Sequence, residues 1–282
     1  MKWQGGRRSR NIEDRRRSGG RTRAGGVGGI GAIVLLLAGW YFGVDVSGFV
    51  GQGAGGNSTQ GEEMTQADVQ AGEFVAVNLG YTEDIWKEIF RTQVGQEYNP
   101  PTMVLFKGST QSACGGASAA TGPFYCPPER RAFLDTSFFT TLDRQMGAKG
   151  DFAAAYVVAH EIAHHVQNEL GILGQANQIR AQVSQGESNA ISVRIELQAD
   201  CFSGIWERNV EQQFGVLERG DIAEALNAAK QIGDDTLQRK AGRRVQPHTF
   251  THGTSEQRQR WFARGFESGN LQDCDTFSTT QL

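Results

Sequence analysis

The pattern of hydrophobic and polar residues predicts two long helices in the second half of the chain. Asp151–Leu170 reads DFAAAYVVAHEIAHHVQNEL, and its residues 152–159 are almost all apolar, as expected of a helix that runs through a core. In Ser188–Gln212 an apolar stripe recurs at helical spacing, formed by Ile191, Ile195, Phe202 and Trp206. We therefore expect two helices with apolar faces turned to the core.

Shorter patterns predict the rest of a globular domain. We expect further helices in Val75–Gln93 and Asp221–Ile232 and after the cap residues Thr254 or Ser255, and short strands in Met103–Phe106 and within Phe124–Asp135. The predicted fold class is α+β, mainly helical with a small sheet.

The N-terminal region differs from this domain in charge and composition. Met1–Arg23 has a net charge of +7, whereas the whole chain has −3, so the remainder carries −10. Residues 27–44, VGGIGAIVLLLAGWYFGV, hold no charge and have about the length that crosses a bilayer core. Residues 51–70 are rich in Gly, Ser, Gln and Thr, which is typical of a flexible tether.

These features predict a basic cytoplasmic tail at 1–26, one transmembrane helix at 27–44, a flexible linker at 45–70 and the globular domain at 71–282. A basic flank stays inside, so we expect a single-pass protein of the cytoplasmic (inner) membrane with its N-terminus inside and its domain periplasmic or extracytoplasmic. The alternative is a cleaved signal peptide, but no A-x-A-like site follows. We interpret the arginines as topology determinants and expect no nucleic-acid partner.

The first long helix carries an HExxH motif formed by His160, Glu161 and His164. Residues four apart share one face of a helix, so both imidazoles are able to bind one metal ion, with Glu161 in reach of its water. Zn²⁺ lowers the pKa of such a water to about 7, and the glutamate takes the proton. The alternative is a chance match, but histidines and a glutamate on a buried helix are unfavourable without a partner. His165 points away from His164, behind the ligands or at the surface.

A catalytic zinc ion takes three protein ligands, so a third must come from elsewhere in the chain. An elongated motif would place Gly and His three and six residues after His164, where Gln167 and Leu170 stand. In the second helix, Glu196 and Asp200 lie four residues apart beside the apolar stripe. We predict Glu196 as the third ligand and Asp200 as the carboxylate that holds a ligand histidine by its far ring nitrogen. The alternative is a solvated acidic face.

Four cysteines without a CxxC motif predict disulfides in an exported domain, with three pairings open. We favour Cys114 with Cys126, which closes a Gly-rich loop, and Cys201 with Cys274, which ties the C-terminal tail to the second helix. A cysteine zinc site lacks its usual close spacing. Free thiols are favoured only if the domain is cytoplasmic.

His252 is a further candidate for the chemistry, because it precedes the cap of the last predicted helix. A histidine held on a loop is able to donate to the oxyanion that forms when an amide is attacked. The alternative is a loop histidine bonded to backbone, and His248 is a weaker candidate.

The segments AYVVAHEIAHHVQ and ELQADCFSGIW resemble those of the bacterial neutral zinc metallopeptidase family, a membrane-anchored group. The resemblance extends over most of the chain, through NIEDRRR, GPFYCP, FTHGTSEQR and CDTF. It implies a zincin-like fold, zinc bound by His160, His164 and Glu196, and Glu161 as the catalytic base. In zincins, the edge strand of a sheet beside the motif helix receives an extended peptide.

The predicted function is that of a membrane-anchored zinc metalloendopeptidase that hydrolyses a peptide or protein substrate, with the lipid bilayer contacted through its N-terminal helix. Two alternatives remain: a non-enzymatic, zinc-stabilised extracytoplasmic binding module, and a zinc amidase that acts on the cell wall. Glu161 counts against the first because a structural zinc site does not need it.

Overall fold

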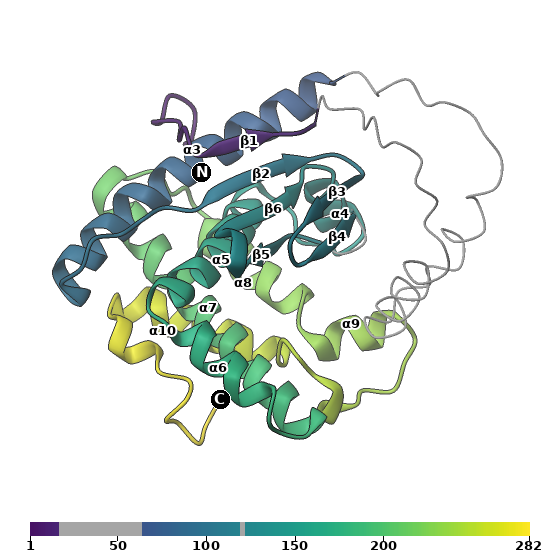
Figure 1. Cartoon of the computed structure of the whole chain (residues 1–282). Helices are drawn as coiled ribbons and strands as arrows, with labels where there is room; N and C mark the ends of the chain where they lie inside the picture. The colour runs from purple at the N-terminus through teal and green to yellow at the C-terminus, as the bar shows by residue number, and fades with distance from the viewer. Residues whose placement is uncertain (17–63, 119–121) are drawn as a thin grey trace.

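The structure, a computed structural model, describes residues 1–16, 64–118 and 122–282. Helix α5 (Asp151–Glu169) lies at the centre, with the small sheet on one side and helices α7 and α10 on the other (Figure 1). The other α-helices are α3 (Gln66–Ile89), α4 (Phe138–Arg144), α6 (Ile172–Arg180), α7 (Gln185–Phe214), α8 (Asp221–Gln231), α9 (Asp234–Lys240) and α10 (Ser255–Ser268). The prediction of a mainly helical α+β fold is confirmed.

Local sequence fixes the ends of the three long helices around α5. Helices α3, α7 and α10 each begin with a capping box, in which the side chains of the cap and of the third helical residue bond to each other's backbone amides. The pairs are Thr65 and Asp68, Ser184 and Glu187, and Thr254 and Gln257. Helices α7 and α10 end at glycines in the left-handed region, Gly215 and Gly269.

The main sheet has the strand order β1–β2–β6–β5, made of β1 (Ile12–Asp14), β2 (Thr102–Phe106), β6 (Arg131–Asp135) and β5 (Phe124–Cys126). Strand β2 pairs in parallel with β1 and β6, whereas β5 is antiparallel to β6. Four of the five residues in both β2 and β6 are buried, as their short apolar runs predict. A separate hairpin joins β3 (Ser109–Ser112) to β4 (Gly115–Ser118).

Helices α7 and α10 approach each other closely because glycines line their contact. A Cβ atom added at Gly204 of α7 would collide with the carbonyl oxygen of Phe262, and one added at Gly265 of α10 would collide with that of Cys201. Small residues at such positions let two helix backbones come together. The C-terminal helix is thereby held against the helix that carries Glu196 and Asp200.

Both disulfides expected from the sequence are present. Cys114 bonds to Cys126 and connects the β3–β4 hairpin to β5. Cys201 bonds to Cys274, so the short helix η4 (Leu271–Cys274) is joined covalently to α7.

The N-terminal residues are part of the domain, which corrects one predicted boundary. Residues 1–26 were expected to form a tail apart from the domain, but β1 forms an edge of its sheet, with Ile12 opposite Met103. The amino group of Met1 donates to Asp151 of α5 at 2.8 Å, and Arg7 donates to the Gly80 carbonyl oxygen at 2.7 Å. These are contacts between segments remote in sequence, which local patterns do not encode.

The other predicted N-terminal boundaries fall mostly outside the described residues. The predicted linker at 45–70 is too long, because α3 already begins at Gln66 with a cap at Thr65. The predicted transmembrane segment at 27–44 lies wholly outside the described residues. Across residues 1–16, 64–118 and 122–282, no helix is long and apolar enough to span a membrane.

Candidate metal centre

Three side chains from two helices converge beside the middle of α5. His160 Nε2 lies 3.1 Å from Glu196 Oε2, and His164 Nε2 lies 3.5 Å from Glu196 Oε1. One donor atom from each of the three residues lies within 4.8 Å of the other two. The HExxH spacing brings the imidazoles together on one helix, and the packing of α7 along α5 adds the carboxylate.

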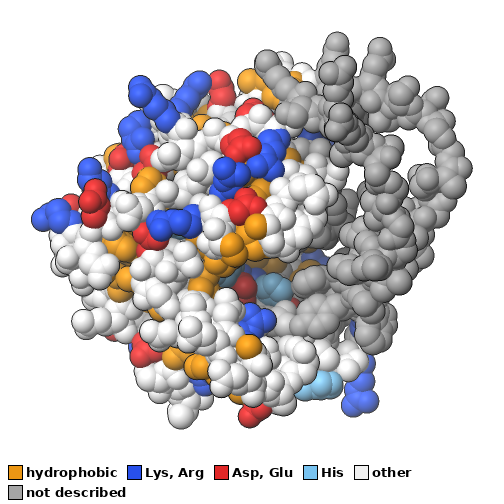
Figure 2. Space-filling view, in the orientation of Figure 1, with side chains coloured by type: hydrophobic (Ala, Val, Ile, Leu, Met, Phe, Trp, Pro, Cys, Tyr) orange, Lys and Arg blue, Asp and Glu red, His pale blue; other side chains and the backbone are white. Residues whose placement is uncertain are grey.

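The cluster is largely buried but remains open to solvent. The side chains of His160, His164 and Glu196 are 8%, 13% and 17% exposed. Figure 2 shows a recess on one face of the molecule with a histidine and an acidic side chain at its bottom and hydrophobic side chains on its rim. A ligand is therefore able to reach the cluster from solvent.

Each of the two histidines has a side-chain oxygen close to its second ring nitrogen, as a hydrogen-bond partner for His164 and as a charge contact outside hydrogen-bond geometry for His160. His160 Nδ1 lies 3.0 Å from Asp200 Oδ1, and the Nδ1 of His164 lies 2.9 Å from the amide oxygen of Gln167. Nε2 of both rings faces Glu196. Metal-binding histidines in proteins are commonly oriented by a carboxylate or carbonyl oxygen in this manner.

The electrostatic environment sets the protonation states of the three donors. Burial lowers the pKa of His164, which favours the neutral imidazole that binds metals. Burial acts to raise the pKa of Glu196, but the neighbouring His164, His252 and His160 hold it well below its ordinary value. For His160, burial acts to lower the pKa, yet Asp200 and Glu196 together raise it to about 9.

This donor set fits a zinc ion. Two imidazole nitrogens and one carboxylate form a common catalytic zinc site, in which a fourth position is left for water or substrate. The carboxylates of Glu196 and Asp200 lie 3.1 and 3.0 Å from the two ring nitrogens of His160, and they favour a positive charge at this place. A divalent cation at the three donor atoms supplies that charge once His160 has lost its proton.

Glu161 lies beside the cluster as a buried carboxyl group with an unsatisfied oxygen. Its side chain follows His160 on α5, the residue is 8% exposed, and its Oε2 has no hydrogen-bond partner among the described residues. Burial, together with the negative charge of Glu196, raises the pKa of Glu161 to about 7, despite the opposing charge of His160. A carboxyl group with such a pKa is able to both accept and donate a proton near neutral pH.

His252 is held near the cluster by Asp234, the first residue of α9. One Asp234 oxygen accepts hydrogen bonds from the backbone amides of Thr251, His252 and Gly253, at 2.8, 2.7 and 3.0 Å. The other lies 3.2 Å from His252 Nδ1. Burial acts to lower the pKa of His252, but Glu196 and Asp234 raise it.

The sequence patterns did not indicate Gln167 or Asp234, and His165 packs toward β5 instead of lying behind the ligands or at the surface. Gln167 follows His164 by three residues on the same helix, so its local spacing could have indicated the contact. Asp234 is 18 residues from His252 and carries no such signal. His165 is fully buried, and its ring lies 3.0 Å from the Tyr125 hydroxyl and 2.7 Å from the Asn99 carbonyl oxygen, so it joins α5 to β5.

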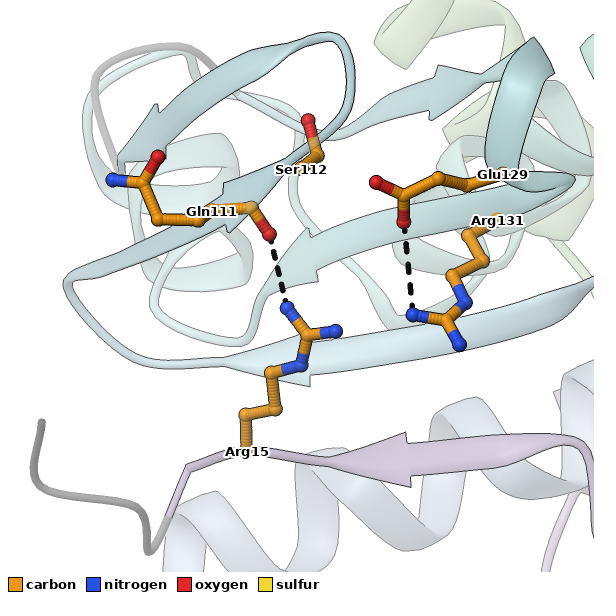
Figure 3. Close-up of a pocket in the computed structure, with 5 residues that line it drawn as sticks. All are labelled: Arg15, Gln111, Ser112, Glu129 and Arg131. Carbon is orange, nitrogen blue, oxygen red and sulfur yellow. Dashed lines mark hydrogen bonds and ion pairs between the residues drawn. The ribbon is translucent and has the colours of Figure 1, made fainter.

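A second concavity, with a volume of about 420 Å³, lies between the β3–β4 hairpin and the segments after β1 and β5 (Figure 3). Its arginines are already engaged: Arg15 donates to the Gln111 carbonyl oxygen at 3.0 Å, and Arg131 lies 3.6 Å from Glu129. Its lining residues are Arg15, Gln111, Ser112, Glu129 and Arg131, so the predicted site residues are not part of it. We assign this pocket no role.

Comparison with known families agrees with the chemistry of the first site. The family described as "Putative neutral zinc metallopeptidase" matches residues 1–277. The chain belongs to this family. The match begins at residue 1, so it includes the arm that forms β1 as well as the helices that carry the metal cluster.

Relatives in the family are similar over long stretches. "Uncharacterized protein YpfJ" of Escherichia coli (strain K12) is 45% identical over 285 residues, which cover 98% of this chain and 99% of the relative. "Uncharacterized protein Rv2575" of Mycobacterium tuberculosis (strain ATCC 25618 / H37Rv) is 44% identical over 208 residues, 70% of this chain and 68% of the relative. No solved structure matches the chain.

Proposed function

We propose that this protein is a zinc-dependent metalloendopeptidase. The observation that carries the proposal is the convergence of His160, His164 and Glu196 beside the buried carboxyl group of Glu161. A structural zinc site has no need of such a glutamate. The description of the family to which the chain belongs supports the same activity.

The roles of the residues follow from their environments. His160, His164 and Glu196 hold zinc, which when bound supplies a Lewis acid that polarises a carbonyl group and makes water more acidic. Glu161 accepts a proton from the attacking water and returns it to the leaving amine, as its pKa of about 7 permits. His252 donates a hydrogen bond to the carbonyl oxygen as negative charge develops there, and Asp234 keeps its ring oriented.

Strand β5 is the proposed binding edge for an extended peptide. It pairs with β6 on one side, and within the described residues no strand covers its other side. It packs on α5, to which the Tyr125 hydroxyl is linked through His165. A peptide added as a further strand would gain backbone hydrogen bonds and lie along the helix that carries the HExxH motif.

We also propose that the domain works outside the cytoplasm. The two disulfides support an oxidising compartment, and residues 27–44 support membrane attachment. The predicted cytoplasmic N-terminus does not fit the pairing of β1 with β2. Residues 27–44 lie between β1 and α3 in the sequence, and both of these elements belong to the same folded domain. We therefore place residues 1–16 on the same side as the domain, which replaces the single-pass topology expected from the sequence. Labelling of a cysteine introduced at the exposed Arg10 in intact cells tests this, and protection from a membrane-impermeant reagent would contradict it.

The catalytic proposal is tested with the purified full-length chain and the variant Glu161→Gln. We expect one equivalent of zinc in both proteins, and a loss of kcat for an unfolded protein substrate of at least about 100-fold in the variant. Glu207→Gln is the matched control. Glu207 is a fully buried glutamate, and neither of its carboxylate oxygens has a hydrogen-bond partner among the described residues. It lies seven residues from Asp200, about 10 Å along α7.

The outcomes separate the alternatives. Bound zinc, together with proteolysis that Glu161→Gln abolishes and Glu207→Gln keeps, supports the peptidase. Zinc without hydrolysis of proteins or of cell-wall amides supports the binding module, and hydrolysis of cell-wall amides alone supports the amidase. Equal activity of Glu161→Gln and wild type removes Glu161 from the mechanism.

A further inference from the structure

We propose that Arg258 and Gln167 are positioning residues, which fix the two ligand histidines through buried polar relays that end in the C-terminal segment. The inference rests on the proposed function only in taking His160 and His164 as zinc ligands. Residues 255–274 contribute no donor atom to the cluster of His160, His164 and Glu196, yet both relays lead to them.

The first relay runs from His160 through Asp200 to Arg258 of α10. Arg258 is 2% exposed, and its guanidinium donates to both carboxylate oxygens of Asp200. Nε donates to Oδ2 at 2.8 Å, and Nη2 donates to Oδ1 at 2.9 Å. The Tyr156 hydroxyl donates to the same Oδ1. A two-point contact of this kind fixes the plane of a carboxylate, whereas a single contact leaves it free to turn. Arg258 therefore fixes the position of Asp200 Oδ1 relative to the His160 ring.

Arg258 also balances the charge behind the metal ligand. Asp200 is fully buried and lies between His160 and Arg258. Without the guanidinium, its full negative charge would act on His160 in a medium that screens poorly. With the guanidinium in place, Asp200 orients the ring while much of its charge is offset.

The second relay runs from His164 through Gln167 to the C-terminal turn. The Gln167 amide nitrogen donates to the Ile195 carbonyl oxygen at 2.8 Å and to Gln198 at 3.0 Å. Gln198 in turn donates to the Cys274 carbonyl oxygen at 3.1 Å. Cys274 is bonded to Cys201 on α7, so this relay ends at a covalently fixed backbone group.

Through the two relays, the C-terminal segment orients the histidines of the site. The close contact of α7 with α10 at Gly204 and Gly265 brings Arg258 within reach of Asp200. The disulfide sets the position of the Cys274 carbonyl oxygen. The relay from each ligand histidine thus ends at a group that follows it by more than 90 residues in the sequence.

The test measures zinc affinity of the full-length chain by competition with a chelator, in wild type, Arg258→Lys and Gln167→Met. Arg258→Lys keeps the charge and loses the two-point contact, and Gln167→Met keeps the side-chain length and loses the amide. We expect each to weaken zinc binding by about 10- to 100-fold, the usual effect of removing an orienting partner. Arg260→Lys, on the exposed side of α10, and Gln175→Met, on the exposed side of α6, are the matched controls.

Tyr156→Phe is a second test, to be used if the Arg258 variant fails to fold. It deletes one donor to Asp200 and leaves the guanidinium in place. We expect a decrease in zinc affinity of a few-fold, and in hydrolysis a lower kcat with unchanged KM. Variants with a lower melting temperature but wild-type zinc affinity would overturn the inference and leave the peptidase proposal intact. Weakened zinc binding in a protein without peptidase activity would support the inference alone. A wild type that binds no zinc would overturn both.

Discussion

Two clusters of three potential metal ligands lie along helix α5, one at its middle and one at its start. The two clusters differ in chemistry. In its middle, His160 and His164 meet Glu196. At its first residue, Asp151 meets Asp221 and Glu224 of α8, also with donor atoms within 4.8 Å of one another. The donor atoms therefore satisfy the same distance limit in both clusters.

The groups around the clusters separate them. At the start of α5, the amino group of Met1 lies 2.8 Å from Asp151 and 3.4 Å from Asp221, so a cation of the chain itself balances the carboxylates. Both aspartates also begin helices, whose N-termini favour negative charge. The middle cluster instead has nitrogen donors held by Asp200 and Gln167 and a carboxyl group suited to proton transfer. Donor type and supporting contacts, more than convergence, therefore distinguish the candidate zinc centre from the acidic cluster.

The largest expected difference between the clusters is in zinc stoichiometry. We expect His164→Ala to reduce zinc affinity by at least about 100-fold, since a lost ligand affects the metal more than a lost orienting partner does. Asp221→Asn should leave one equivalent of zinc bound. Metal analysis after dialysis measures both. Zinc lost from Asp221→Asn and kept by His164→Ala would reverse the assignment of the two clusters.

A second difference is in catalysis. We expect His252→Ala to lower kcat about 100-fold, the effect of removing one donor to a developing oxyanion, with the zinc content unchanged. Asp234→Asn keeps the size of the side chain and should lower kcat less, because the backbone amides of residues 251–253 still have an acceptor. Steady-state kinetics with zinc analysis measures this. If His252→Ala retains wild-type kcat, the histidine serves only to hold its loop.

The smallest effect is expected at the start of α5, in the pH dependence of stability. Burial acts to lower the pKa of the Met1 amino group, but Asp151 and Asp221 raise it above its ordinary value of 8.0. A raised folded-state pKa means that this stabilisation is complete below pH 8 and is lost as the pH rises through the folded-state pKa. Because the Asp151 side chain is 40% exposed, we expect less than about 1 kcal/mol.

Denaturant unfolding at pH 7 and at pH 10 checks this expectation. The wild type should lose more stability between the two pH values than Asp151→Asn does, and zinc affinity at pH 7 should be equal in the two proteins. The same pH dependence in both proteins would mean that the amino group and Asp151 are not coupled. A change in zinc affinity would mean that the two clusters are not independent.

Much of the fold was predictable because it depends on local patterns. The apolar runs and cap residues predicted α5, α7, α8 and α10 to within a few residues, and β2 likewise. The predicted start of the N-terminal helix was too late, because the first turns of α3 follow a cap at Thr65 within a stretch that lacks an apolar pattern. The arm at residues 1–16 was assigned to a tail because its pairing partner β2 lies about 90 residues away.

The sequence by itself determined the groups that share a helix face. His160 with His164, and Glu196 with Asp200, are each four residues apart, and helical geometry alone places such pairs together. Only the tertiary structure decided which distant groups complete them. Arg258 reaches Asp200 across 58 residues and Tyr156 across 102, and these contacts exist because α10 packs on α7 through glycines. Periodicity records which face of an element is buried, but not which side chain lies opposite it.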